Sequence, residues 1–320
     1  MPNTTITPFN LRLHELQHQA VRDLAWCCFS PSLMQRLPES DAVILPFNND
    51  RYWPWLKALD QQPDELIAYI AKVKSIRLGI YYETLWRFYF SQHAEWELLQ
   101  HNLQLERNGV TLGAFDFLCR RGSEYWHIET AVKFYLCNAY NAQDALAWHH
   151  WIGPASQDRL DLKLAHLRQH QLPLHQRAEA KTQLRNLYPN VAEWKSGLCL
   201  QGYLFSPVST QYSPAFSSEN HGNGYWWYLQ DFLQHLSEHS DTRWIILERQ
   251  RWLSPAHSND PDELVYGAGL AQQLQLQTSE MKRPLLLAAL KKTDSRDNCW
   301  QEDWRGFVVP DNWPQKQSAT

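Results

Sequence analysis

The charged residues with the clearest chemical potential lie in the most strand-like part of the chain, residues 111–136. Asp116 stands between two phenylalanines, and Glu129 and Lys133 are spaced among apolar residues. A sheet core excludes unpaired charge, because moving an ionised group out of water is costly. Two acids and a lysine in such a segment therefore indicate a functional site.

The spacing predicts that the two acids share one face of a hairpin. Alternate side chains of a strand lie on the same face, and so do directly opposed residues of an antiparallel pair. A four-residue turn at 120–123 would set Asp116 opposite His127. Glu129 would then be its diagonal neighbour, with the backbones about 7–8 Å apart. An odd-length turn would separate the two acids.

Two neighbouring carboxylates on a buried face repel each other. The pKa of one of them rises unless a positive charge lies between them. Oxygen ligands of this kind suit Mg²⁺ or Mn²⁺, and such an ion activates water and stabilises charge on a phosphate. We therefore expect Asp116 and Glu129 to bind a divalent metal, although hydrogen bonds to turns or ion pairs would satisfy either acid alone.

The elements that must position these acids follow from hydrophobic periodicity and turn residues. Asn108-Gly109 predicts a tight turn before the hairpin, and Ser156 or Asp158 is the expected N-cap of the helix that follows it. The predicted order is a helix at 64–90 with a possible break near Gly79, a strand at 96–107, the two hairpin strands, a helix at 156–171 and a strand at 196–207.

Three short strings in this order resemble the core of the PD-(D/E)XK nucleases: GIYYETLW with Glu83, GAFDFL with Asp116 and HIETAVK with Glu129. The resemblance covers residues 77 to about 205 and implies an α-β-β-β-α-β core that cleaves nucleic acid with a divalent metal. It further implies that Glu83 supports the metal directly or through water.

Two positions depart from the nuclease pattern. That pattern has a lysine two residues after the glutamate, where this chain has Ala131, and Ala114 stands where we would expect another acid. Lys133 is on the face of Glu129 with its backbone about 13 Å away, so it would have to reach back. Lys163 on the following helix could substitute, and the resemblance assigns one of these two lysines to the attacking water.

Longer strings, among them TLGAFDFL, HIETAVKFYL and RGFVVPDNWP, are similar to a bacterial family of uncharacterised conserved proteins. This similarity spans most of the chain and implies no activity. The fold class we predict is α/β (α+β), with a PD-(D/E)XK restriction-endonuclease-like core. The predicted regions are N-terminal helices at 1–76, the nuclease-like core at 77–205 and a C-terminal α+β extension packed on the core at 206–320.

The C-terminal region is predicted to mix strands and helices. Its predicted elements are a helix at 225–239, a strand at 242–253, a helix at 262–277, a strand at 284–292 and a tail from 305 with a polar end.

The composition is that of a globular protein. The chain has 320 residues, of which 44% are hydrophobic and 20% charged, and its sixteen tryptophans suit an aromatic core. A net charge of −4 argues against a wholly basic coat, but a local basic groove would still bind nucleic acid. The sequence has no Walker loop, GxGxxG or GxSxG motif, so those nucleotide and hydrolase classes find no support.

The expected location is the cytoplasm. The first residues lack a basic segment followed by an apolar one, and no apolar run approaches the ~20 residues of a membrane helix. We therefore expect no membrane association. The six cysteines lack zinc spacing, and several of them lie in apolar segments, which predicts reduced thiols in the core.

Several candidates keep two interpretations. Glu83 could form an ion pair with Arg87, four residues on, as readily as support a metal. His127 is more simply a hydrogen-bonded sheet histidine than a metal ligand. Trp226 and Trp227 could stack on bases, although core packing is commoner for such a pair.

The function that we expect is Mg²⁺- or Mn²⁺-dependent hydrolysis of phosphodiester bonds, with DNA as the substrate. The alternative is a catalytically inactive protein of nuclease fold that binds nucleic acid or a protein partner. Ala114 and Ala131 favour the alternative, whereas the presence of both Asp116 and Glu129 favours the enzyme.

Overall fold

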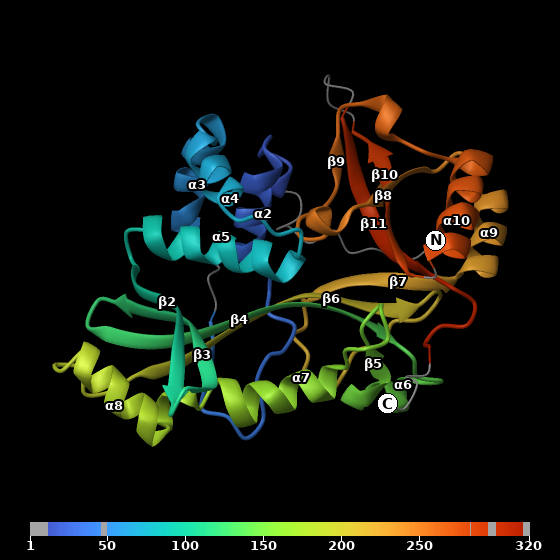
Figure 1. Ribbon diagram of the computed structural model, residues 1–320. Coiled ribbons are helices and arrows are strands. Elements are labelled where there is room, and N and C mark those ends of the chain that lie inside the picture. The colour runs from blue at the N-terminus through green and yellow to red at the C-terminus, as the bar shows by residue number, and fades with distance from the viewer. Residues whose placement is uncertain (1–11, 46–49, 282, 294–298, 316–320) are drawn as a thin grey trace.

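One mixed sheet runs through the molecule, and the predicted site residues lie on it or on the helices that cover it (Figure 1). The structure is a computed structural model that describes residues 12–45, 50–281, 283–293 and 299–315. Parts of the predicted N-terminal helical region, residues 1–11 and 46–49, therefore lie outside the described residues. The predicted mixed α/β class is confirmed.

The main path of the sheet is β2-β3-β4-β6-β7-β11-β10-β8, with β1 beside β6, β5 beside β4 and β9 beside β11. The strands of the first half are β1 (Val43–Ile44), β2 (Glu97–Arg107), β3 (Val110–Arg121), β4 (Glu124–Cys137), β5 (Trp151–Ile152) and β6 (Lys195–Pro207). Those of the second half are β7 (Gly222–Tyr228), β8 (Arg243–Leu247), β9 (His257–Ser258), β10 (Leu285–Lys292) and β11 (Trp300–Val309).

Helices cover both faces of the sheet (Figure 1). One face carries α2 (Gln19–Phe29), α3 (Trp53–Gln61), α4 (Asp64–Ala71) and α5 (Leu78–Gln92). The other face carries α6 (Ala142–Ala145), α7 (Leu160–His166) and α8 (Ala178–Leu187). The C-terminal strands pack against α9 (Leu229–Glu238) and α10 (Gly267–Met281).

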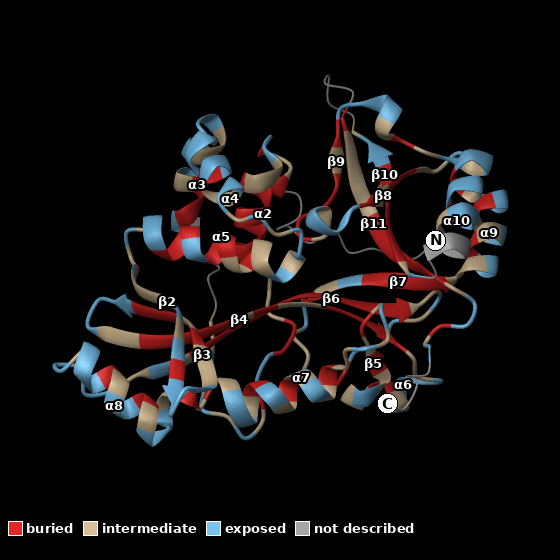
Figure 2. Ribbon diagram, in the orientation of Figure 1, coloured by how far each residue is buried: buried red, intermediate tan, exposed pale blue. Residues whose placement is uncertain are grey.

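Burial follows this layering. Figure 2 shows buried residues along the strands and on the sheet-facing sides of the helices, with exposed residues on their outer sides. All six cysteines are buried and free, which confirms the prediction of reduced thiols. No helix in the described ranges combines the length and the apolar character that crossing a membrane requires.

The middle of the chain follows the predicted order of elements: α5, β2, β3, β4, α7 and β6, with short elements between β4 and β6. The strands β2, β3 and β4 form an antiparallel meander. β6 then pairs with β4 in parallel over eleven residue pairs, so that Glu129 lies beside Leu198 and Lys133 beside Gly202. A long parallel pair of this kind fixes the position of every side chain on β4 relative to the helices.

Two helix predictions need correction at their boundaries. The helix expected at 64–90 is two helices, because residues 72–77 are not helical. That interval contains Val73, Ser75 and Ile76, whose helix propensities are lower than those of alanine, leucine, lysine and arginine. The predicted N-caps are also wrong: Arg159 holds that position, and the carboxylate of Asp158 binds Lys133 instead.

The C-terminal region differs more from the prediction. Residues 225–228, expected at the start of a helix, form the end of strand β7, where Trp226 and Trp227 are both buried. Their place in the core agrees with the simpler interpretation of this pair. Residues 305–309, expected at the start of a tail, belong to β11. The aromatic run of the first segment and the apolar residues Phe307, Val308 and Val309 of the second suit strands that are buried between two neighbours.

Candidate functional site

The hairpin that carries the two acids has a shorter turn than predicted. Only Gly122 and Ser123 separate β3 from β4, and the last regular pair of the ladder is Phe117 with Ile128. The register is therefore shifted by two residues from the predicted one. The turn is still even in length, and the next positions along the two strands are Asp116 and Glu129.

Asp116 lies where the ladder between β3 and β4 ends. Its Oδ2 accepts a hydrogen bond from the backbone N–H of Thr130 at 2.9 Å, in place of a strand-to-strand bond. Burial raises the pKa of Asp116 to about 7, and the negative charges of Glu129 and Glu83 raise it further. The hydrogen bond from Thr130 lowers this pKa and partly offsets the rise. Asp116 thus lies within the electrostatic reach of both other predicted acids.

Glu129 is fully buried and has a partner on each carboxyl oxygen. Its Oε1 lies 2.7 Å from Nε2 of His127, and its Oε2 accepts a hydrogen bond from the Gln171 amide at 2.5 Å. Burial raises the pKa of Glu129 to about 7. Hydrogen bonding with Asp116 and Gln171 and the charge of Lys163 lower this pKa and partly offset the rise. His127 therefore has the hydrogen-bonded role that the sequence favours.

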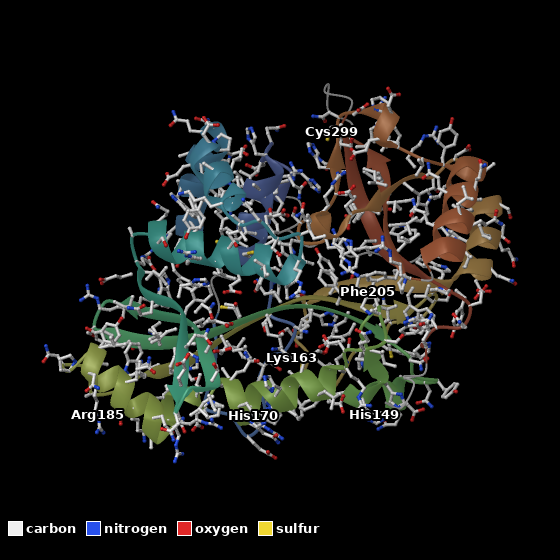
Figure 3. The ribbon with its side chains drawn as sticks, viewed as in Figure 1. His149, Lys163, His170, Arg185, Phe205 and Cys299 are labelled. Atoms are coloured by element: carbon white, nitrogen blue, oxygen red, sulfur yellow. The ribbon has the colours of Figure 1, made fainter. Side chains whose placement is uncertain are left out.

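The two candidate lysines have different surroundings. Lys163 Nζ donates to Oε1 of Gln171 at 2.8 Å, so one amide separates this amine from Glu129. Burial lowers the pKa of Lys163, as does the charge of Lys133. Lys133 Nζ instead donates to Oδ2 of Asp158 at 2.5 Å. Figure 3 places Lys163 between α7 and the sheet.

Glu83 approaches Asp116 from the opposite layer of helices. Its Oε1 lies 2.7 Å from Nε2 of His101 on β2, so its partner is this histidine and not the Arg87 that the sequence offers. The guanidinium of Arg87 lies over the ring of Tyr69, 5.7 Å from its centroid.

Several residues of the site could not be found from sequence. Gln171 ends a π-helical turn that follows α7 and brings its amide between Lys163 and Glu129. His175 extends the network, with its Nδ1 3.3 Å from Nδ1 of His127. Burial lowers the pKa of both histidines to about 4, so both rings are neutral at pH 7. No local motif marks these positions, because the path of the chain after α7 determines them.

The carboxyl pair is the part of the site that could hold a hard divalent cation. Two neighbouring carboxyl groups with raised pKa values are only partly ionised near pH 7. A cation can replace the proton that they retain. In the described residues no group of three or more His, Cys, Asp or Glu side chains is arranged to hold a metal. An ion bound here would have Asp116 and Glu129 as its protein ligands, and water or substrate oxygens would have to supply the others.

Comparison with known proteins gives a family and no named relative. No curated protein and no solved structure matches the chain. The model of a family described as a domain of unknown function, DUF1853, matches residues 22–309, which include the whole sheet from β2 to β11 and every candidate site residue. The chain therefore belongs to the DUF1853 family.

Proposed function

We propose that the protein is a divalent-metal-dependent nuclease that hydrolyses phosphodiester bonds in DNA. The observation that carries the proposal is the placing of Asp116 and Glu129 on neighbouring strands, with the Lys163 amine one amide away from Glu129. The pKa values of both acids are raised to about 7. Acids with strongly raised pKa values near a partly buried amine are typical of sites that bind a cation or transfer a proton.

The order of elements supports this proposal. A helix, an antiparallel meander of three strands, a second helix and a parallel fourth strand follow one another from α5 to β6. The PD-(D/E)XK resemblance implies this same order, with its acids on the second and third strands. Asp116 on β3 and Glu129 on β4 match those positions.

Each residue would have a distinct role. Asp116 and Glu129 would hold Mg²⁺ or Mn²⁺, and Glu83 would add negative charge from the other side of Asp116. When bound, the ion would activate water and neutralise charge on the phosphate. Lys163 would orient the attacking water, since its pKa is lowered and, within the described residues, its amine donates a hydrogen bond to the Gln171 amide alone. Lys133 is less suited because Asp158 binds its amine.

Cleavage of supercoiled plasmid DNA with Mn²⁺ tests the proposal. We expect the wild-type protein to nick the plasmid and the Asp116→Asn variant to do so more than about 100-fold more slowly. Mutating a residue that only supports a metal ligand already lowers activity about 10–100-fold, so removing a ligand should cost more. Lys163→Ala should lose far more activity than Lys133→Ala. The matched control is Asp161→Asn, which removes an acid that pairs with Arg159 on the outer part of α7.

Equal cleavage by wild type and Asp116→Asn, with circular dichroism showing that both are folded, would remove the carboxyl pair from the reaction. If wild type cleaves and neither lysine variant is slower, another group orients the water.

A second candidate is a protein that binds nucleic acid without cleaving it. One observation favours it: both carboxyl oxygens of Glu129 already have hydrogen-bond partners, His127 and Gln171, which a metal would have to displace or share. Ala131, in place of the usual lysine, points the same way. Steeply salt-dependent DNA binding without cleavage by Mg²⁺ or Mn²⁺ would select this candidate.

A further inference from the structure

A cavity of about 560 Å³ lies beside the candidate site, between α8 and the first residues of β6. Its volume is within the range of sites that hold small organic ligands. One of its walls includes His175, whose Nδ1 lies 3.3 Å from Nδ1 of His127, and His127 in turn contacts Glu129. Two imidazole rings in series therefore separate the cavity from the carboxyl pair.

Two cations from α8 line this cavity. Lys181 and Arg185 are four residues apart, so they lie on one face of the helix, and both are exposed. Neither forms an ion pair with an acid in the ranges that the structure describes. Figure 3 shows Arg185 on α8, on the same side of the sheet as Lys163. By contrast Lys195, also at the cavity, is paired with Glu124.

The cavity also offers an aromatic surface and hydrogen-bond acceptors. Trp194 lines it and is held by edge contacts with Tyr125 and Tyr188, whose ring centroids lie 5.6 and 5.5 Å away. The carboxylates of Asp41 and Glu193 line it as well. A ligand that fits all these groups has an anionic part, a flat ring and N–H donors on that ring.

We propose that this cavity binds one nucleotide of the substrate strand, with its phosphate on Lys181 and Arg185 and its base against Trp194. A base inside a cavity cannot remain paired, so the preferred substrate is a single strand or an unpaired end. The role as a substrate subsite rests on the proposed nuclease function, whereas nucleotide binding does not.

Calorimetry on the full chain tests the binding with three probes: 5′-deoxyadenosine monophosphate, deoxyadenosine and inorganic phosphate. We expect the monophosphate to bind at least about tenfold more tightly than either part, because it alone engages both the cations and the ring. The double variant Lys181→Gln with Arg185→Gln should weaken its binding by about tenfold or more. Trp194→Leu should weaken the binding of the monophosphate and leave the affinity for inorganic phosphate unchanged.

The matched control is Lys72→Gln with Lys292→Gln, which removes two positive charges from exposed positions away from the cavity. This control should bind the monophosphate like the wild type. Equal affinity for phosphate and monophosphate would overturn the proposal by showing a simple anion site. Absence of binding by the wild type at millimolar monophosphate would overturn it as well, as would equal losses in the control and the α8 variant.

Different results would overturn the nuclease proposal and the nucleotide-site proposal. Asp116→Asn should keep full affinity for the monophosphate, since the cavity does not include this residue. If the wild type binds the monophosphate and cleaves no DNA, the nucleotide site stands and the nuclease proposal falls. If it cleaves single-stranded DNA as fast after the α8 substitutions as before them, the subsite is overturned while the nuclease proposal stands.

Discussion

At the scale of single residues, the carboxyl pair makes the stability of the fold depend on pH. Asp116 and Glu129 have ordinary pKa values near 4 in an unfolded chain and values of about 7 in the folded protein. An acid whose pKa is higher in the folded state binds more protons there. Its contribution to stability is present below pH 4 and is lost as the pH rises toward 7.

We expect Asp116→Asn to be more stable than the wild type at neutral pH, because the amide keeps the shape of the protonated acid and carries no charge. The difference in free energy of unfolding should widen between pH 4 and 7 and level off above pH 7, at on the order of 4 kcal/mol. Urea denaturation at pH 5, 6, 7 and 8 measures it. A constant difference across this series would contradict the raised pKa of Asp116.

The comparison with the variant also cancels an opposing effect of the two neighbouring histidines. His127 and His175 have pKa values lowered to about 4, so each binds fewer protons in the folded than in the unfolded protein. The contribution of the histidines to stability therefore rises with pH between about 4 and 6.5, whereas the contribution of the acids falls. Both proteins contain these histidines, so most of this effect drops out of the difference.

At the scale of elements, the contact between β4 and β6 determines where the site residues of β4 lie. Gly202 on β6 pairs with Lys133 and has a φ of +140°, in a region that residues with a Cβ rarely adopt. A Cβ built at this position would lie 1.7 Å from the carbonyl oxygen of Lys133. The two strands can approach this closely only because residue 202 is a glycine.

We therefore expect Gly202→Ala to destabilise the protein by about 3 kcal/mol or more, through backbone strain and a clash that must push β4 away. Gly79→Ala is the control, because a Cβ there meets nothing within 4 Å and alanine favours the helix α5. The control should be neutral or stabilising by up to about 1 kcal/mol. Thermal unfolding compares the two, and similar melting temperatures would contradict the close approach.

The sequence predicted elements better than it predicted how they meet. The turn at Asn108-Gly109 and the strands on either side of it were readable because local turn chemistry and alternation specify them. The exact register of the next hairpin was wrong by two residues, because turns of two and four residues preserve the same alternation. The partners Gln171 and His175 depend on tertiary packing after α7, which local periodicity does not encode.

At the scale of the whole molecule, one buried polar network joins the helices α2 and α5 to the strand β11. Asp23 on α2 is fully buried and accepts hydrogen bonds from the backbone and side chain of Ser254, at 3.1 and 2.7 Å. Tyr81 on α5 donates to the same carboxylate at 2.8 Å. Arg305 on β11 donates to the carbonyl of Ser254 at 2.9 Å, and its charge is balanced by Glu302.

This network predicts that the N-terminal helices and the C-terminal strands unfold together. Asp23→Ala would leave the Ser254 and Tyr81 donors without their acceptor in the interior, at a cost of roughly 3 kcal/mol. The far-UV circular dichroism and tryptophan fluorescence transitions of this variant should both shift and still coincide, because the packing of both ends depends on the same acceptor. Asp262→Ala is the control, since this acid is exposed, and its transitions should match those of the wild type. If Asp23→Ala instead splits the two transitions, the N-terminal helices are a separate unit whose stability the C-terminal strands do not share.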